Sequence, residues 1–211
     1  MKSRKLFKVC ALLMLAVMSC LLFSGCGGQS EQKKFVITYL PNESTDKNAD
    51  ARKGMAGDLS KVLGMEVTEL VSNDYNAVIE AMRTGKADMA YFGPLSFCLA
   101  YERAGAEPIG MIAKDKDKKN ATYKSVLVTS SKNTDINSIQ DIKGKTMAFV
   151  DPNSTSGNLI PSAAIMKAFP GEKLSMDDLH TNGKFFQAVS FSGKHQAGLA
   201  AAVSYTHLRA H

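Results

Sequence analysis

Cysteine is scarce in this 211-residue chain, and its four cysteines are not placed to form an internal disulfide. Cys10 and Cys20 lie in an N-terminal apolar segment, and Cys26 directly follows that segment. Cys98 is the only cysteine after residue 26, and its apolar neighbours predict a small core residue. The sequence therefore excludes a fold that depends on disulfide bonds.

Long apolar runs are also lacking after residue 23, so no later segment is predicted to cross a bilayer as a helix. The one long run covers residues 6–23, after Lys2, Arg4 and Lys5 and before Ser24-Gly25-Cys26. This pattern predicts a secretory signal, because small residues and a cysteine end the run. A transmembrane anchor is the alternative interpretation.

The end of this segment, Phe23-Ser24-Gly25-Cys26, resembles the lipobox of bacterial lipoproteins, with Phe23 where leucine is usual. The resemblance implies removal of residues 1–25 and diacylation of Cys26, and two acyl chains suffice for a stable anchor. Residues 26–33 would form a short polar tether. We therefore expect a lipid-anchored protein of the cell envelope, at the extracytoplasmic face of a bacterial membrane.

The excess of positive charge is smaller than the whole sequence indicates. The formal charge is +6, but Lys2, Arg4, Lys5 and Lys8 belong to the predicted signal, which leaves +2. This charge is no basis for a nucleic-acid partner, and none is expected. Without its first 25 residues the chain keeps 186 of its 211, enough for one α/β domain and part of another.

Residues 34–121 alternate between strand-like and helix-like segments. Strands are predicted over residues 34–40, 66–71 and 87–92, where β-branched and aromatic residues gather. Helices are predicted over residues 48–63, from the cap Asn73-Asp74 to Gly85, and over residues 95–104. This order implies a parallel sheet with both faces covered. Ligands bind outside the carboxyl ends of such strands, so the loops after Leu40, Val71 and Phe92 are candidates.

Two further strands are predicted over residues 108–113 and 122–130, and the second would lead the chain into a second lobe. Residues 114–119 alternate in charge and lack the glycine of a calcium loop, so a solvated turn is expected there. A short helix over residues 137–142 would precede a strand over residues 146–150.

The loop Asp151-Pro152-Asn153-Ser154-Thr155-Ser156-Gly157 is the strongest candidate for a binding site. It connects that strand to a predicted helix over residues 158–169. Backbone N–H groups lack partners at a helix start, and the helix dipole is positive there. The hydroxyls of Ser154, Thr155 and Ser156 add donors without adding charge. The alternative is an ordinary Ser/Thr N-cap, which is the commoner arrangement.

Five features in a set order resemble one family. They are Asp74-Tyr75, the run 85–93 (GKADMAYFG), the run 123–127 (YKSVL), the loop 151–157, and His195. Together they resemble the phosphate-, phosphite- and phosphonate-binding components of bacterial ABC importers, from about Lys34 to Val203. The resemblance implies an α/β fold like that of type II periplasmic binding proteins. Its first lobe would be residues 34–121 and an incomplete second lobe residues 122–203.

The resemblance also implies the ligand-binding residues, which are Tyr75, Tyr91, Ser154, Thr155, Ser156 and His195. The serines and the threonine would hold phosphonate oxygens by hydroxyl and backbone N–H groups. The two tyrosines would line the cleft, and the histidine would donate to the phosphonate group. Packing is the alternative role for the tyrosines and a surface position for the histidine. His180 is interpreted as structural, and no cofactor, metal or catalytic residue is expected.

The implied function is the capture of a phosphorus oxyanion for an ABC permease, by closure of two lobes around the ligand. One alternative is a binding protein for another solute, such as a sulfonate or a thiamine precursor. Another is a serine hydrolase that uses Ser154 or Ser156 with His195. The hydrolase is disfavoured because the Gly-x-Ser-x-Gly pattern of a nucleophile elbow is absent here.

The last residues depart from the pattern of the family. Residues 198–203 are typical of the middle of a helix, whereas residues 204–211 hold two of the chain's four histidines. The string SYTHLRAH resembles translated sequencing adapter, so we expect residues 204–211 to be non-native and the second lobe to be cut short. The carboxylates that recognise an aminoalkyl group in this family would lie beyond this point. Which phosphorus oxyanion binds is therefore left open.

Overall fold

The computed structural model describes residues 34–41, 46–113 and 115–204. The predicted signal peptide, Cys26 and the tether lie outside the described residues, as do residues 205–211. Within the described ranges, no helix combines the length and apolar character needed to cross a membrane.

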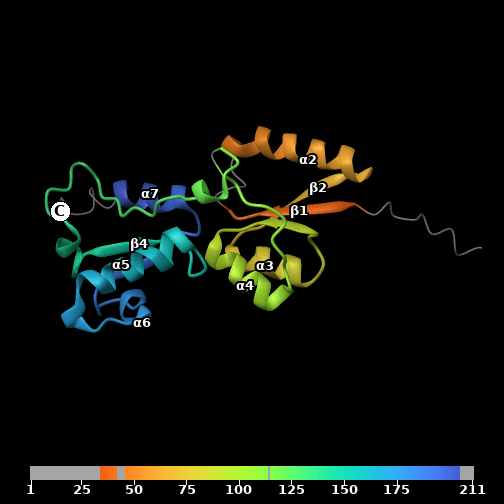
Figure 1. Ribbon diagram of the computed structural model, residues 1–211. Coiled ribbons are helices and arrows are strands. Elements are labelled where there is room, and N and C mark those ends of the chain that lie inside the picture. Colours follow the sequence, from red (N-terminus) through yellow and green to blue (C-terminus); the bar gives the residue numbers. More distant parts are fainter. Residues whose placement is uncertain (1–33, 42–45, 114, 205–211) are drawn as a thin grey trace, which may run out of the picture. The chain divides into compact units, whose positions relative to one another are not determined.

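A three-stranded parallel sheet, in the order β2-β1-β3, organises the first half of the described chain (Figure 1). The central strand β1 (Phe35–Tyr39) pairs with β2 (Val67–Val71) on one side and with β3 (Met89–Tyr91) on the other. All three strands match predicted ones to within two residues. The parallel pairing places the ends at Tyr39, Val71 and Tyr91 along one edge, where the sequence predicted the candidate loops.

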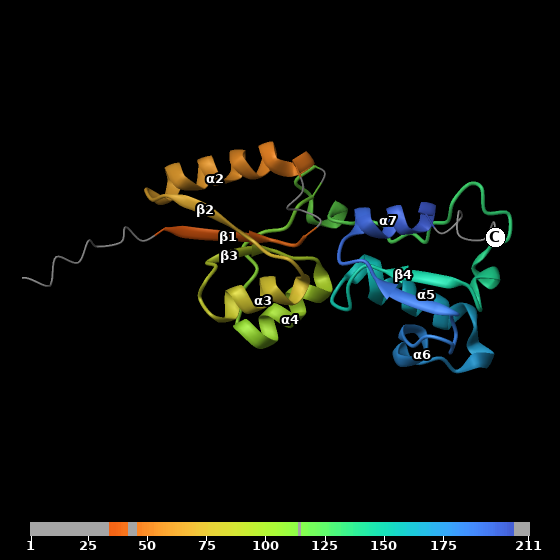
Figure 2. The ribbon, with the colours of Figure 1, turned by 180° about the vertical axis from the view of Figure 1, so that it is seen from behind.

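Helices cover both faces of this sheet, as predicted. α2 (Ala49–Leu63) lies on one face, and α3 (Tyr75–Arg83) and α4 (Pro94–Ala104) lie on the other (Figures 1 and 2). The carboxylate of Asp74 caps α3 by accepting a hydrogen bond from the backbone N–H of Ala77 at 2.7 Å. This cap fixes where α3 begins, directly after the loop that follows β2.

A second, two-stranded parallel sheet follows, formed by β4 (Thr146–Phe149) and β5 (Ala188–Phe191). α5 (Ile160–Ala168) lies on one face of this pair and α7 (His195–Ser204) on the other (Figures 1 and 2). The short helix α6 (Met176–His180) precedes β5. The helix predicted around residues 198–203 is confirmed as part of α7.

The core of this second half is aromatic. Five buried residues pack together, namely Phe149, Ile165, Leu179, Phe185 and Phe186. Phe149 and Phe186 meet edge to face with ring centroids 6.2 Å apart, and Phe185 and Phe186 do so at 4.9 Å. Phe149 is the last residue of β4, so the core anchors the strand that leads into the loop 151–157.

A smaller cluster joins the end of β4 to the first sheet. Val150 packs with Leu40, Tyr75 and Val78, all of them buried. The region from Lys34 onward accordingly forms one compact unit by its contacts. The division of this region into two lobes remains a prediction.

Two predicted strands are absent from the described structure. Residues 108–113 and 122–130 run without regular secondary structure, so the strand prediction was wrong for both. Their β-branched residues favour an extended backbone, but a strand also needs a neighbour with which to pair. Within the described ranges neither segment has one, and Ile109 (83%) and Val126 (70%) are largely exposed.

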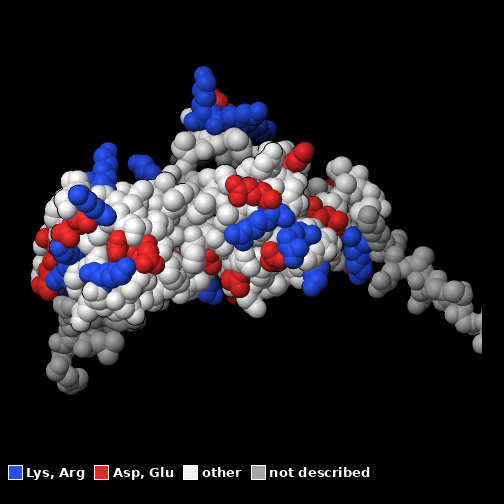
Figure 3. Space-filling view, turned by 90° about the horizontal axis from the view of Figure 1, so that it is seen from below, with Lys and Arg blue, Asp and Glu red and all other residues white. Residues whose placement is uncertain are grey.

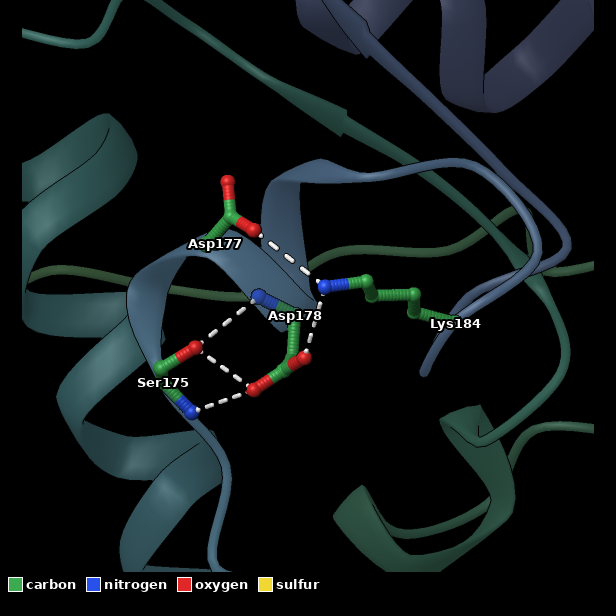
Figure 4. A network of polar contacts seen from close by, with 4 residues as sticks. All are labelled: Ser175, Asp177, Asp178 and Lys184. Atoms are coloured by element: carbon green, nitrogen blue, oxygen red, sulfur yellow. Dashed lines mark hydrogen bonds and ion pairs between the residues drawn. The ribbon is translucent and has the colours of Figure 1, made fainter.

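On the face shown in Figure 3, charged side chains of both signs are interspersed, with uncharged surface between them. One polar network holds α6 in place (Figure 4). Ser175 and Asp178 form a capping box, and Lys184 reaches Asp178 at 3.1 Å and Asp177 at 3.2 Å. Hydrogen bonds from the side chain and the backbone of Ser175 are the largest causes that lower the pKa of Asp178, and the hydrogen bond from Lys184 adds to them. This pKa falls to about 2.

The network predicts a pH-dependent contribution of Asp178 to stability. Because the pKa is lower in the folded chain, the contribution is complete above about pH 4 and is lost as the pH falls toward about 2. Asp178→Asn should therefore melt at a lower temperature than the unchanged chain at pH 7, and the gap should shrink on acidification. Thermal melts followed by circular dichroism between pH 7 and pH 2 measure it.

Asp177→Asn is the matched control. The Asp177 side chain is 81% exposed and makes one ion pair, with Lys184, so its removal should change the melting temperature little at any pH. An equal loss of melting temperature in both variants would contradict the role given to Asp178. So would a difference in melting temperature between Asp178→Asn and the unchanged chain that does not narrow in acid.

Candidate ligand-binding site

The loop 151–157 leaves the carboxyl end of β4 and enters a π-helical turn, η4 (Thr155–Leu159), which continues into α5. Ser154 caps this turn. Its hydroxyl accepts a hydrogen bond from the backbone N–H of Gly157 at 3.1 Å, and its backbone N–H donates to the Asp151 carbonyl at 2.9 Å. Ser154 is 2% exposed. The predicted helix start is confirmed, and Ser154 has the capping role of the alternative interpretation.

The far end of the loop requires a glycine. A Cβ atom at Gly157 would lie 2.3 Å from Cγ2 and 2.4 Å from Cβ of Val150. Val150 also donates its backbone N–H to the Gly157 carbonyl at 3.0 Å. Because Val150 is itself packed against Leu40 and Tyr75, it cannot move aside easily. The loop is thus closed tightly against the end of β4.

Thr155 connects the loop to the first sheet. Its hydroxyl oxygen accepts a hydrogen bond from the backbone N–H of Leu95 at 2.8 Å. Leu95 lies in the first turn of α4, so the beginnings of α4 and η4 meet at this hydroxyl. Helix beginnings carry partial positive charge and unpaired N–H groups, which together attract anions.

Asp151 ties a third helix start to the loop. Its carboxylate accepts the backbone N–H of Asn153 at 2.8 Å and also interacts with the backbone N–H of Tyr75, the first residue of α3. Burial raises the pKa of the Asp151 carboxyl, against the opposing effect of these two N–H groups. Three helix beginnings, those of α3, α4 and η4, are therefore gathered around one loop.

Ser156 and His195 both line a cavity of about 890 Å³. The Ser156 carbonyl accepts a hydrogen bond from the Ser125 hydroxyl at 2.7 Å. The Ser156 hydroxyl makes no hydrogen bond with any of the described residues. His195 is exposed at the start of α7, after a turn whose Gly193 N–H donates to the Val150 carbonyl at 2.6 Å.

The remaining predicted site residues do not line this cavity. Tyr75 is 3% exposed and packs in the cluster with Val150, and its contact with a ligand stays a prediction. Tyr91, the last residue of β3, is partly buried. Ala90 and Phe92 pack against the Tyr75 cluster, and side chains alternate along a strand, so Tyr91 points to the opposite face. The cavity thus unites two of the six predicted residues.

The structure brings two more residues to the loop, and the sequence had given neither a role, although Tyr123 belongs to the run 123–127 that carried the resemblance. The hydroxyl of Tyr123 lies 3.7 Å from where a Cβ of Gly93 would stand, and the Thr155 hydroxyl oxygen lies 3.4 Å from the same point. The side-chain amide of Asn158 donates to the Pro152 carbonyl at 2.9 Å, and its oxygen contacts His180 Nε2 at 2.7 Å. No sequence pattern predicts that Tyr123 lies near Gly93 or that Asn158 contacts His180, because only the folded chain brings these residues together.

His180 has the structural role expected for it. Its ring contacts Phe149 and Phe191 edge to face, with 5.1 Å between ring centroids in each case. Burial lowers the pKa of His180, so the ring is neutral at pH 7. Through Asn158 it supports the carbonyl of Pro152 and hence the shape of the loop. Among the described residues, no group of three or more His, Cys, Asp or Glu side chains is placed to hold a metal ion.

Comparison with known families identifies the chain. The family described as "ABC transporter, phosphonate, periplasmic substrate-binding protein" matches residues 37–206. The chain belongs to this family. The resemblance found in the sequence is thereby confirmed.

Individual curated members of the phosphonate-binding family are also similar to this chain in sequence. The chain is 31% identical over 157 residues to the "Phosphate-import protein PhnD" of Mycolicibacterium smegmatis, which covers 70% of this chain and 49% of that protein. It is 31% identical over 145 residues to the "Phosphonates-binding periplasmic protein" of Escherichia coli, with 66% and 42% covered. The chain therefore spans about half the length of these two relatives.

Solved structures agree on the fold. A binding protein component of an ABC phosphonate transporter from Pseudomonas aeruginosa superposes with a TM-score of 0.65, at 23% identity over 83% of this chain and 55% of the other. PhnD1 from Prochlorococcus marinus, in complex with methylphosphonate, gives a TM-score of 0.55 at 23% identity, with 82% and 61% covered. The fold is thus the α/β fold of periplasmic binding proteins.

The tight contact at Gly157 leads to a stability prediction. Gly157→Ala forces a methyl group into Val150 and should cost roughly 1–3 kcal/mol of the free energy of unfolding, as overpacking does. Gly57→Ala is the control, because Gly57 lies within α2 with nothing within 4 Å of its ideal Cβ. That change should stabilise the chain by roughly 0.5–1 kcal/mol, since alanine favours a helix interior. Urea denaturation measures both, and a neutral Gly157→Ala would refute the packing argument.

Proposed function

We propose that this protein captures a phosphorus oxyanion, namely a phosphonate, phosphite or phosphate, and presents it to the permease of an ABC importer. Membership of the phosphonate-binding family supports the proposal. Relatives at 31% identity are named for phosphate, for phosphonates and for phosphite. These three ligands share a tetrahedral phosphorus and at least two oxygens that accept hydrogen bonds.

The meeting of two helix beginnings at Thr155 is the observation that carries the proposal. The Thr155 hydroxyl accepts from Leu95, which leaves its own proton to donate. The Ser156 hydroxyl, which has no hydrogen-bond partner among the described residues, is a second neutral donor. Neutral donors in the field of helix dipoles stabilise an oxyanion without a fixed positive charge. In this proposal His195 donates to the phosphorus oxyanion, and Tyr75 and Tyr91 line the cleft.

The proposed transport cycle follows from ligand contacts on both sheets. Leu95 belongs to the first sheet's helices and residues 154–156 to the second sheet's loop. A ligand that contacts both sides stabilises a closed arrangement of two lobes, which the permease recognises. We further propose that Cys26 is diacylated and holds the protein at the extracytoplasmic face of the membrane.

A serine hydrolase that uses Ser154 as its nucleophile finds little support. The hydroxyl of Ser154 is buried and occupied as a helix cap, whereas a nucleophile must be accessible to its substrate. The family is one of substrate-binding components and not of enzymes. A binding protein for a sulfonate or a thiamine precursor remains the competing function.

Isothermal titration calorimetry distinguishes these ligands. Methylphosphonate, phosphite, phosphate and methanesulfonate would each be titrated into the chain at pH 7. We expect saturable binding of at least one phosphorus oxyanion, with no loss of ligand to hydrolysis. Binding of methanesulfonate alone, or of none of the phosphorus oxyanions, would sink the proposed function.

The role of Ser156 can be tested separately. Ser156→Ala removes one donor to a charged ligand and should weaken binding about 10- to 100-fold, because such hydrogen bonds contribute about 1.5–3 kcal/mol. The melting temperature should not change, since this hydroxyl bonds to none of the described residues. Ser190→Ala, on an exposed residue of β5, is the matched control and should retain full affinity. Equal affinity in both variants would remove Ser156 from the site.

A further inference from the structure

The side-chain amide of Asn158 connects the two ends of the loop 151–157. Its nitrogen donates to the Pro152 carbonyl at 2.9 Å, so one hydrogen bond encloses the segment that carries the hydroxyls of residues 154–156. Asn158 is 2% exposed. A buried amide is costly unless its polar atoms are hydrogen-bonded, so the chain must provide a partner for the amide oxygen as well.

His180 provides that partner. Its Nε2 lies 2.7 Å from the Asn158 oxygen. An amide oxygen can only accept, so Nε2 carries the proton and donates it. Burial lowers the pKa of His180, so the ring is neutral at pH 7 and its single N–H is used in this bond. The Ser162 hydroxyl reaches the same oxygen at 3.4 Å, which is a longer and weaker contact. The direction of the amide therefore depends mainly on His180.

Aromatic packing holds the His180 ring in place. His180 is the last residue of α6, and its ring meets those of Phe149 and Phe191 edge to face, with centroids 5.1 Å apart in both pairs. Phe149 belongs to β4 and Phe191 to β5. The side chain thus has two separable properties, because its carbon atoms pack against the second sheet while its N–H donates to Asn158.

The turn that Asn158 belongs to has an uncommon geometry. In the π-helical turn η4 the N–H of Leu159 donates to the Ser154 carbonyl, five positions earlier, at 3.1 Å. Turns of this kind are rare and are often found at functional sites. A rare backbone geometry persists only where its surroundings support it. The hydrogen bonds of the Asn158 side chain are contacts of this kind.

We propose that His180 is a positioning residue for the oxyanion site, an inference that rests on the proposed function. His180 does not contact the ligand in this proposal. Through Asn158 it holds the Pro152 carbonyl and η4, and so determines where the Ser156 hydroxyl and the first N–H groups of η4 point. Donors that are already in position bind an anion more tightly, because less ordering is needed when the ligand arrives.

Two substitutions of His180 separate packing from hydrogen bonding. His180→Phe keeps an aromatic ring against the second sheet but cannot donate to Asn158, whereas His180→Gln keeps an N–H donor and loses the ring. In isothermal titration calorimetry, methylphosphonate should bind at least about fivefold more weakly to His180→Phe and within about twofold of the unchanged affinity to His180→Gln. Ser162→Ala removes only the longer contact and is the matched control, with full affinity expected.

The order of the two affinities decides between the roles. If ring packing alone matters, His180→Gln binds more weakly than His180→Phe, and the proposal is overturned. Equal affinity of His180→Phe and the unchanged chain would overturn it as well.

Amide hydrogen exchange tests the positioning role without a ligand. The amides of residues 153–157 should exchange at least about fivefold faster in His180→Phe than in the unchanged chain, and at the unchanged rate in His180→Gln. If His180→Phe does not fold, Asn158→Ala removes the same link from its other end and should show the same faster exchange. Unchanged exchange in these variants, or equally fast exchange in both His180 variants, would overturn the role of His180. An unchanged chain that binds no phosphorus oxyanion would instead refute the proposed function.

Discussion

The close approach of Gly157 to Val150 is the contact on which the binding loop depends. Val150 ends the strand segment that precedes the loop, and its side chain packs with Leu40, Tyr75 and Val78 from the first sheet. Gly157 lies directly against it because no Cβ intervenes. One valine thus joins the two sheets and closes the loop.

The loop also shows how helix caps and the proposed anion site can share one structure. Ser154 satisfies the N–H of Gly157, and Thr155 satisfies the N–H of Leu95 in a different helix. Both are ordinary capping interactions, which organise the backbone in the absence of ligand. The hydroxyl of Ser156 makes no hydrogen bond with any of the described residues, so it is available for the proposed ligand. The two interpretations of the loop are therefore compatible, because different residues carry the two roles.

Much of the fold followed from local patterns. The sequence predicted the ends of four elements to within two residues, namely β1, β2, β3 and α2. Apolar periodicity and flanking glycines mark such ends, and both are visible in a short stretch of sequence. β5 has four residues and α6 has five, and neither was predicted because such short segments carry little pattern. Residues 122–130 were predicted as a strand and are not one, since a strand needs a neighbouring strand and none pairs with them among the described residues.

The sequence by itself determined the family, the parallel order of the first sheet and the loop 151–157 as a helix start rich in hydroxyls. Each depends on short motifs, within which the residues are close together along the chain. Only the tertiary structure decided which of these residues meet. It joined Thr155 to Leu95, held Pro152 through Asn158 and His180, and buried Tyr75 in a cluster with Val150. The physical reason is that these contacts span from 6 positions, for Pro152 and Asn158, to 75 positions, for Tyr75 and Val150. Packing, not local preference, selects among such pairs.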